Sequence, residues 1–308
     1  MTPGHARADT PSTEVASTDQ RAVDITVLLP AWNEEAAVGP VIREVRAVMA
    51  ARPESYEILL VDDASTDGTA AAAEALGARV VRRALQGGSG ASRKTGVREA
   101  RGALIVMMDT DGSYDAADIP KLLAMFPRWD QVNGDRASEK GTLKALRVPA
   151  KWFIRRIAIL LAGRHIPDLN TGLKAFKREP MLRYLWVVPD GFSCVTSMTL
   201  AFMTNGQAVT WVPVNYRPRI GVSKFRPFRD GARYLATVVR MVTYFRPLRV
   251  FGPLGLLLIA GSVAKGVHDL MVVEKGLQES TIVLSVGGLL VLLLGLLADL
   301  IVAQKKLQ

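Results

Sequence analysis

The sequence predicts an α/β domain with a mainly parallel sheet, followed by two membrane-spanning helices. Two observations support this prediction. In residues 25–111, short apolar and β-branched runs alternate with segments of helical periodicity, which is typical of parallel strands joined by helices. In residues 250–302, two apolar runs approach or reach the length of about 20 residues that a helix needs to cross a bilayer.

Composition narrows the possible functions. The chain has 308 residues, 49% of them hydrophobic, which allows a sizeable core in one or two domains. A formal charge of +10 favours nucleic acid, an acidic lipid or an anionic substrate as a partner. The single cysteine, Cys194, excludes an intramolecular disulfide framework and a cysteine-based zinc cluster. We interpret Cys194 as a small buried hydrophobic residue, because only three histidines are present to activate it.

The first 22 residues are rich in Thr, Ser, Ala, Pro and charged residues. They contain no apolar segment of the kind found in signal peptides. We therefore expect residues 1–22 to be a disordered tail and the domain that follows to stay in the cytoplasm.

The elements of the domain follow in a regular order. The predicted strands are apolar and β-branched runs, at 25–30, 56–61, 79–82, 105–108 and 209–216. The predicted helices carry apolar or alanine-rich faces, and lie near 37–51, directly after 69, at 91–100 and at 119–126.

Polar or glycine-rich segments follow the strands. They occupy residues 30–34, 62–67, 87–90 and 109–111. Ligands of parallel sheets bind at the carboxyl ends of strands, so the shared location of these segments predicts one binding site.

Asp109 and Asp111 stand directly after the fourth predicted strand. In an extended chain, side chains two residues apart point to the same side, and two carboxylates in a crevice repel each other unless a positive charge lies between them. A divalent cation that already holds a diphosphate would supply that charge. A strand that ends in a polar turn at Asp111-Gly112 is the alternative, and these residues alone support both interpretations equally.

The regular alternation weakens after Asp118. Residues 140–156 form a basic segment, which suits a solvated face or side chains that snorkel at a lipid surface. Residues 228–246 predict an amphipathic helix on the membrane surface, with a core-facing helix as the alternative. Its apolar stripe would be Leu235, Val238, Val239, Val242 and Phe245, opposite Arg229, Arg233 and Arg240.

The C-terminal apolar runs, at about 250–273 and 281–302, predict a transmembrane hairpin, with buried soluble helices as the alternative. The first run can span a bilayer only if Lys265 and Asp269 lie towards the interface. Arginines precede the pair of runs and Lys305-Lys306 follow it, so the positive-inside rule places both ends in the cytoplasm and the link 274–280 on the far side.

Three motifs of the first half resemble the inverting glycosyltransferases of family 2, which have the GT-A fold. They are residues 30–34 (Pro-Ala-Trp-Asn-Glu), 61–69 (Val-Asp-Asp-Ala-Ser-Thr-Asp-Gly-Thr) and 109–112 (Asp-Thr-Asp-Gly). Later motifs resemble the polyprenyl-phosphate branch, which includes dolichyl-phosphate mannose synthase and bacterial undecaprenyl-phosphate sugar transferases. These later motifs lie at 134–136, 168–176 and 216–224, so the resemblance covers about residues 25–226.

The resemblance implies a nucleotide-diphosphate sugar as donor, and Mg²⁺ or Mn²⁺ held by Asp109 and Asp111. It implies donor binding by Pro30, Ala31, Asn33, Glu34, Asp62, Asp63, Gly88, Lys94, Asp109 and Thr110. The mannose synthases carry a glutamine two residues past the second aspartate as a further metal contact. Ser113 stands there in this chain, so we expect metal binding to be weaker or to be completed by water.

The resemblance also implies a polyprenyl phosphate as acceptor. Its phosphate would be bound by Arg136, Arg147, Lys151, Arg219, Ser223 and Lys224, and catalysis would involve Asp111, Arg136 and Asp168. Arg147 matches less well, because the serine that the family often shows four residues later is Lys151 here. A lipid phosphate is already anionic, so the protein needs to offset repulsion and stabilise the departing nucleotide rather than supply a general base. Attack opposite the leaving group would invert the anomeric centre.

We therefore predict a membrane-bound hexosyltransferase, with GDP-mannose and UDP-glucose as the favoured donors. Its parts would be the tail 1–22, a GT-A domain 23–227, an interfacial helix 228–249 and a hairpin 250–308, and the apolar helices would allow a homo-oligomer. Two alternatives are a processive polysaccharide synthase, whose Gln-x-x-Arg-Trp motif is not visible, and a membrane-tethered nucleotide-sugar-binding scaffold without turnover. A nucleic-acid binder is disfavoured, because the basic residues are not interleaved with aromatic residues that stack on bases.

Overall fold

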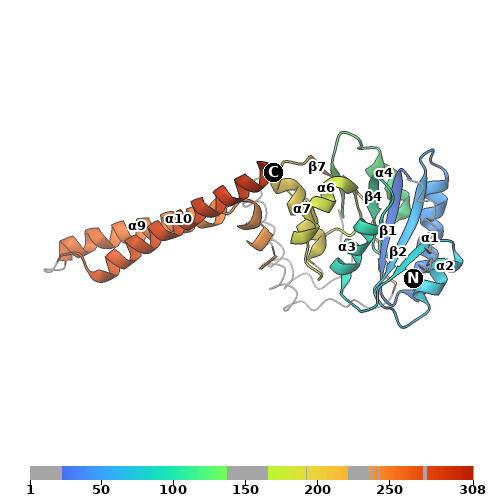
Figure 1. Ribbon diagram of the computed structural model, residues 1–308, viewed down its shortest axis with the longest axis horizontal. Helices are drawn as coiled ribbons and strands as arrows, with labels where there is room; N and C mark the ends of the chain where they lie inside the picture. Colours follow the sequence, from blue (N-terminus) through green and yellow to red (C-terminus); the bar gives the residue numbers. More distant parts are fainter. Residues whose placement is uncertain are drawn as a thin grey trace, which may run out of the picture.

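The chain forms an α/β domain from which a long helical hairpin projects (Figure 1). The computed structural model describes residues 23–136, 166–191, 193–220, 236–237, 239–241, 243–272 and 276–307. The predicted tail 1–22 and the whole basic segment 140–156 lie outside the described residues.

A sheet of seven strands forms the centre of the domain, in the order β3-β2-β1-β4-β6-β5-β7. β6 is antiparallel to both of its neighbours and the other neighbouring strands are parallel, which confirms the prediction of a mainly parallel sheet. The strands are β1 (Ile25–Ala31), β2 (Tyr56–Asp62), β3 (Arg79–Arg82), β4 (Leu104–Met107), β5 (Gln131–Asp135), β6 (Lys174–Lys177) and β7 (Val209–Pro213).

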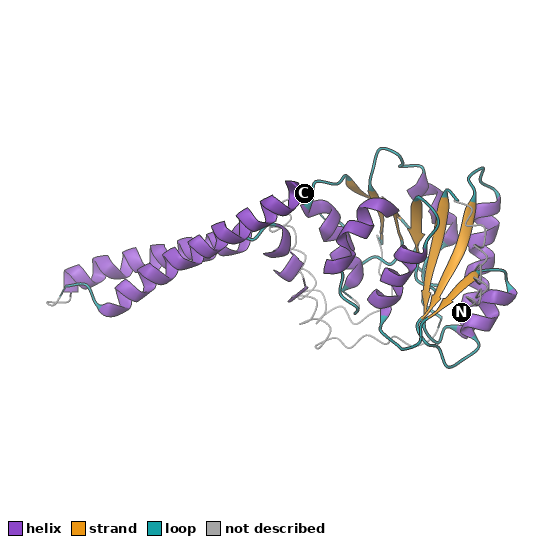
Figure 2. Cartoon of the chain, in the orientation of Figure 1, coloured by secondary structure: helices purple, strands orange, loops and turns teal. Residues whose placement is uncertain are grey.

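Helices cover both faces of this sheet (Figure 2). Leu28 and Leu29 are adjacent in β1 and completely buried, yet they belong to hydrophobic clusters on opposite faces. One cluster packs against α1 (Glu35–Ala50), α2 (Thr69–Ala75) and α4 (Ile119–Leu123), and the other against α3 (Ser89–Glu99), α6 (Arg178–Tyr184) and α7 (Cys194–Thr204). Burial on both faces explains why the central strands are continuous apolar runs. Two short 3₁₀ helices are η1 (Ala116–Asp118) and η2 (Leu185–Val187).

The second half of the domain contains elements that the periodicity did not predict. Every residue of α7 is buried, so this helix has no polar face to produce an amphipathic pattern. β6 has only four residues, two of them lysines. The predicted end of β7 at Tyr216 is wrong, because the strand ends at Pro213.

The hairpin consists of α9 (Leu248–Val272) and α10 (Glu279–Leu307), both long and apolar enough to cross a membrane. This confirms the predicted two-helix hairpin. The start of α9 and the C-terminus both lie at the α/β domain, and the turn lies at the far end (Figure 1). Lys265 and Asp269 lie in the part of α9 that faces the turn, where Lys265 Nζ is 2.9 Å from an Asp269 oxygen. Asp269 also accepts a hydrogen bond from the Gln278 N–H, at 3.2 Å.

Part of the predicted interfacial helix is described, and residues 239–241 and 243–245 are helical. Met241 and Phe245 are buried in the core beneath α6 and α7, whereas Val239 is 39% exposed. The prediction that Phe245 belongs to a membrane-facing stripe is therefore wrong: this side chain packs against the α/β domain. Leu235, Val238, Val242, Arg229 and Arg233 lie outside the described residues.

Candidate functional site

The predicted site residues gather at one edge of the sheet, where β1, β2 and β4 end and β6 begins. β6 runs antiparallel to β4, with Met107 opposite Lys174. Continued by two residues, this register brings Asp109 next to Gly172. A Cβ atom at Gly172 would lie only 2.1 Å from Asp109 Oδ2, so the carboxylate occupies the space that a side chain would need.

Asp109 and Asp111 are each paired with an arginine. Arg93, which is buried in α3, donates to Asp109 Oδ1. Arg219 Nη2 lies 2.7 Å from Asp111 Oδ2. The other Asp111 oxygen accepts hydrogen bonds from the backbone N–H of Ser113, at 3.0 Å, and from its hydroxyl. The two carboxylates therefore have the positive partners that their proximity requires.

Ser113 supports Asp111 from behind. Its side chain is 1% exposed and its hydroxyl donates to the Asp111 carboxylate. Ser113 therefore orients a candidate metal ligand, which is a role that outer residues commonly have at metal sites.

Arg136 and Asp168 form a two-pronged ion pair. Arg136 Nε and Nη2 lie 2.6 and 3.0 Å from the two Asp168 oxygens, and Nη2 also donates to the Asn170 carbonyl at 3.1 Å. The arginine stands over the ring of Tyr216, 5.2 Å from its centre. Burial alone would raise the pKa of Asp168, but the Arg136 fork outweighs it and holds this pKa below the usual range. Asp168 is therefore ionised at neutral pH, and its two oxygens fix the direction of Arg136.

Two buried polar residues lie behind the site. Lys174 is completely buried, and its Nζ is 2.8 Å from the Val195 carbonyl and 2.9 Å from Thr199 Oγ1. Burial lowers the pKa of Lys174 to about 7. Tyr114 is also buried, and its hydroxyl accepts a hydrogen bond from the Gly172 N–H at 2.7 Å. Burial raises the pKa of Tyr114 above its ordinary value.

Several predicted donor-binding residues connect the loops to one another. The Asn33 carboxamide oxygen accepts from the Thr66 N–H at 2.8 Å, and the Thr110 hydroxyl donates to the Pro30 carbonyl at 2.8 Å. Asp63 accepts from the N–H groups of Gly87 and Gly88, at 3.1 and 2.7 Å. Asp62 is buried and accepts from the Ser65 N–H at 3.2 Å, and the Ala31 carbonyl accepts from the Asp63 N–H at 2.9 Å. These contacts hold the loops that form the site.

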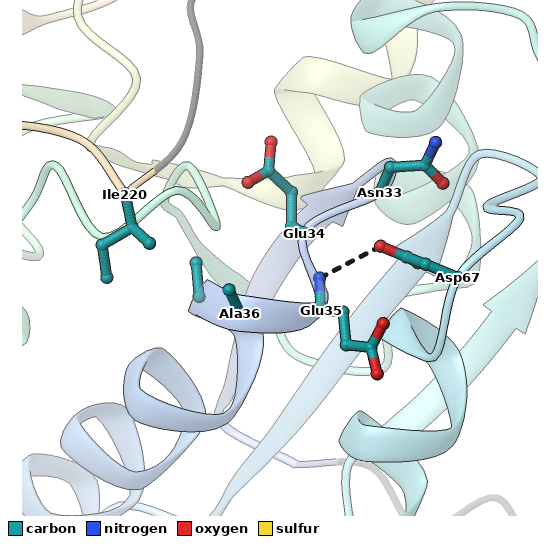
Figure 3. Close-up of a pocket in the computed structure, with 7 residues that line it drawn as sticks. Asn33, Glu34, Glu35, Ala36, Asp67 and Ile220 are labelled. Atoms are coloured by element: carbon teal, nitrogen blue, oxygen red, sulfur yellow. Dashed lines mark hydrogen bonds between the residues drawn. The ribbon is translucent and has the colours of Figure 1, made fainter.

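A pocket of about 380 Å³ opens at the start of α1 (Figure 3). Ile220 lies on one side and Asp67 on the other, with the Glu34 carboxylate between them. Asn33 and Glu35 complete the polar lining, and the Glu35 N–H donates to Asp67 at 3.3 Å. Three carboxylates make this pocket suitable for groups that donate hydrogen bonds and unsuitable for phosphate.

Arg93 is the residue that the sequence reasoning missed. Its neighbour Lys94, which the sequence predicted as a donor-binding residue, forms an ion pair with Asp190 at 2.6 Å. The signal was present: Arg93 shares a helix face with Gly90 and Val97, and all three are buried. Arg147, Lys151, Ser223 and Lys224 lie outside the described residues.

Comparison with known families agrees with this geometry. Residues 26–185, just over half of the chain, match the family described as Glycosyl transferase family 2. The chain belongs to glycosyltransferase family 2. Residues 246–303 of this transferase match a second family, described as the GtrB C-terminal hairpin, which corresponds to α9 and α10.

Individual relatives of this glycosyltransferase cover most of its length. Glycosyltransferase AglJ of Haloferax volcanii is 31% identical over 301 residues, which are 92% of this chain and 95% of that protein. A dolichyl-phosphate hexose transferase from the same organism is 29% identical over 71% of this chain and 93% of its own. A dodecaprenyl-phosphate galacturonate synthase of Rhizobium johnstonii is 28% identical over 77% of this chain and 72% of its own.

The fold of the transferase also matches a solved structure. Glucosyl-3-phosphoglycerate synthase of Mycobacterium tuberculosis, solved with Mn²⁺, UDP-glucose and phosphoglyceric acid, superposes with a TM-score of 0.54. It is 20% identical and the match covers 71% of this chain and 80% of that one. At this identity the match shows the fold, which is the predicted GT-A architecture.

The donor atoms at the strand edge suit a hard divalent cation. Among the described residues, no group of three or more His, Cys, Asp or Glu side chains could form a complete metal cage. Mg²⁺ does not require one, since it commonly binds through one or two carboxylates, water and the phosphates of a substrate. Asp109 and Asp111 supply this minimal set, and Arg219 stands on one of the oxygens that the ion would use.

Proposed function

We propose that this transferase moves a hexose from a nucleotide-diphosphate sugar to a polyprenyl phosphate at the cytoplasmic face of a membrane. The transfer inverts the anomeric centre. GDP-mannose and UDP-glucose are the favoured donors. The observation that carries the proposal is the cluster of Asp109, Asp111 and three arginines at one sheet edge, in a domain that continues into an apolar hairpin.

The names of relatives support the choice of acceptor. The Haloferax hexose transferase is named for dolichyl phosphate and the Rhizobium synthase for dodecaprenyl phosphate. Both are polyprenyl phosphates, although the first is named for a hexose and the second for galacturonate. The acceptor is therefore the better supported half of the reaction, and the donor needs a direct test.

The charges of the site suit a reaction between two anions. A lipid phosphate attacks without losing a proton, so no general base is needed. Asp168, ionised and held by both prongs of Arg136, orients that arginine. Arg136 and Arg219 are the described arginines that we assign to the phosphates, because a guanidinium binds phosphate through two parallel hydrogen bonds.

Asp109 and Asp111 would hold Mg²⁺ or Mn²⁺. Such an ion neutralises the diphosphate and stabilises the departing nucleotide. Arg93 keeps Asp109 in position, and Ser113 does the same for Asp111. The acidic pocket of Glu34, Glu35 and Asp67 suits the base and ribose, whose N–H and O–H groups are hydrogen-bond donors.

The test is a transfer assay with purified full-length protein. The protein is incubated in detergent with Mn²⁺, polyprenyl phosphate and a panel of radiolabelled nucleotide sugars that includes GDP-mannose, UDP-glucose and UDP-galacturonate. Label that enters the organic phase is counted. The Asp111→Asn variant removes the candidate metal ligand. Asp24→Asn is the matched control, because Asp24 is exposed and lies just before the start of β1, at the end of the strand away from the site.

We expect metal-dependent transfer from one donor, loss of it in Asp111→Asn and normal activity in Asp24→Asn. Proton NMR of the product then gives the anomeric configuration. Donor binding without transfer from any sugar would favour the scaffold alternative, and transfer of many sugars to one growing chain would favour the processive synthase.

A further inference from the structure

Two aromatic residues from distant parts of the chain lie against each other, with tilted rings, on the surface of the α/β domain. Trp186 in η2 is 62% exposed and Tyr244 is 43% exposed. Their ring centres are 5.7 Å apart. We call Trp186 and Tyr244 the aromatic patch.

The chain around the aromatic patch is well packed. Leu185 and Val187, on either side of Trp186, are 4% and 7% exposed. The ring of Trp186 also lies 6.3 Å from that of Phe245, which is 6% exposed. An ordered surface thus presents a large indole outwards. Single exposed apolar side chains are common, whereas contiguous exposed apolar surface marks an interaction site, so the pair matters through the apolar surface that it continues.

The aromatic patch adjoins the hairpin. Tyr244 precedes the start of α9, Leu248, by four residues, and even fully extended these span only about 14 Å. Val250, in the first turn of α9, packs against the same cluster as Phe245. From Leu254 onwards α9 displays leucines that are 47–70% exposed, at Leu254, Leu256 and Leu257. The apolar surface that requires lipid therefore begins beside the patch.

The chemistry of the surroundings suits the lipid headgroup region. Tryptophan and tyrosine concentrate at this depth, where the ring is in contact with apolar chains and its polar atom with water. Arg240 lies on the exposed side of the same helical segment and, with Trp186 and Tyr244, lines a groove of about 120 Å³. A guanidinium next to two aromatic rings is complementary to an anionic headgroup.

We propose that the aromatic patch is a membrane-contact site, through which the α/β domain itself rests on the headgroup layer. A second copy of the chain would explain an exposed aromatic pair, but it would not explain the continuity of this pair with the lipid-facing leucines. The proposal rests on the hairpin lying in a bilayer and does not depend on which sugar is transferred.

The loop that follows Trp186 connects the aromatic patch to α3, the helix that carries Arg93 to the active site. Asp190 lies four residues after Trp186, and its carbonyl accepts from the Gly90 N–H at 2.7 Å. Its carboxylate pairs with Lys94 at 2.6 Å. Both contacts hold the first turns of α3, which carries Arg93 to Asp109. Contact at the patch would therefore fix the height of the carboxylate pair above the bilayer.

Tryptophan fluorescence in vesicles tests the proposal. Full-length protein is reconstituted in anionic phospholipid vesicles, with or without lipids brominated on the acyl chain near the headgroup, which quench indoles that reach them. Trp186→Phe removes one of five tryptophans. The matched control is Trp129→Phe, because Trp129 packs against the cluster on the other face of the sheet. Flotation with vesicles verifies separately that the hairpin of each variant is inserted.

We expect the fraction of emission that brominated lipid quenches to fall in Trp186→Phe and not in Trp129→Phe. Equal quenching in wild type and Trp186→Phe overturns the proposal. In that case the same comparison of wild type and Trp186→Phe is made with acrylamide, a water-soluble quencher. If acrylamide quenches the emission of Trp186, the indole faces water. If neither quencher reduces this emission, the indole faces a second copy or another protein surface.

Discussion

At the scale of single residues, the site depends on a glycine that makes room for a carboxylate. Gly172 lies opposite Asp109 because β6 and β4 are antiparallel in the observed register. The Gly172 N–H donates to Tyr114 at 2.7 Å, so its backbone cannot retreat without breaking a buried hydrogen bond. Any side chain at this position would displace the Asp109 carboxylate.

We therefore expect Gly172→Ala to abolish most of the activity. The new Cβ would lie 2.1 Å from Asp109 Oδ2, and a displacement of about 1 Å in a catalytic group can lower the rate by about 100-fold. The control is Gly191→Ala, where a Cβ meets nothing within 4 Å. Steady-state kinetics with Mn²⁺ titration measures both variants. Equal activity in the two would contradict the role of Gly172.

Lys174 shows how much polarity the interior accepts. Its amine has two acceptors, Val195 O and Thr199 Oγ1, which match the two N–H bonds of a neutral amine. Burial lowers the pKa of Lys174 to about 7, from an unfolded value of 10.5. Below pH 7 the Lys174 amine is protonated in both the folded and the unfolded protein, so folding bears the full cost of burying a charged amine. Between these two values the unfolded state binds more protons, so stability rises with pH.

The expected signature is a pH-dependent difference from Lys174→Met. Relative to this variant, the wild type should gain up to about 1.4 kcal/mol of unfolding free energy per pH unit as pH rises above 7. Thermal unfolding in detergent from pH 6.5 to 9.5 would show the two melting temperatures drawing together or crossing. A difference that is constant over this range would mean that Lys174 keeps its proton.

The sequence predicted some site residues better than others, for local reasons. Asp109 and Asp111 were predictable because a carboxylate pair after a buried strand is a local pattern. The pairing of Arg219 with Asp111 is not local, since the two residues are 108 positions apart. They meet only because 216–220 folds back onto the strand edge. There the Ile220 N–H donates to the Asp111 carbonyl at 2.9 Å. Arg93 could have been found from its helix face.

At the scale of elements, periodicity predicted the helices that have one apolar and one polar face, and the strands that are buried on both faces. β1, β2 and α1 follow these patterns and were predicted nearly to the residue. α7 is buried on all sides and contains four Thr or Ser residues, so neither its length nor its face stands out. Three of the four hydroxyls donate to a backbone carbonyl one turn earlier, and that of Thr196 donates to the Leu169 carbonyl. β6 is held by its two neighbours rather than by its own propensity.

The hairpin is held together by glycines that allow α9 and α10 to approach closely. A Cβ at Gly288 would lie 2.8 Å from Ile259 Cγ1 and 3.0 Å from its backbone nitrogen. At the adjacent Gly287 it would meet nothing within 4 Å. Small residues at helix contacts are typical of membrane proteins, where close packing replaces the hydrophobic effect as the driving force.

This adjacent pair provides a controlled stability test. We expect Gly288→Val to destabilise the hairpin by about 1–3 kcal/mol, the usual cost of overpacking, and Gly287→Val to cause no loss. Thermal unfolding of the full-length protein in detergent, followed by circular dichroism, compares them. Equal melting temperatures would show that the helices separate or shift at no cost.

At the scale of the whole molecule, both ends of the hairpin return to the α/β domain (Figure 1). We expect this domain to be cytoplasmic and the turn to lie across the membrane, because several arginines and lysines flank the domain side of the hairpin whereas the link 274–280 contains one lysine, Lys275. The active site then opens on the side where nucleotide sugars are made.

Cysteine labelling in intact cells tests this orientation. Ser280→Cys places a thiol in the exposed first turn of α10, and Ala71→Cys places one at an exposed position of α2. The natural Cys194 is buried and should stay unlabelled. An impermeant maleimide should label Ser280→Cys in intact cells and Ala71→Cys only after lysis. The reverse pattern would place the domain outside.

The ion pair between Arg219 and Asp111 implies an order of addition. Arg219 is paired with a carboxylate that the donor's metal would also bind, so we expect donor binding to release this arginine for the second phosphate. We therefore expect a soluble short-chain polyprenyl phosphate to bind more tightly once nucleotide diphosphate and Mn²⁺ are present, as measured by calorimetry. Arg219→Gln should remove this enhancement while leaving nucleotide binding intact. An acceptor affinity that ignores the nucleotide would mean that the two substrates enter independently.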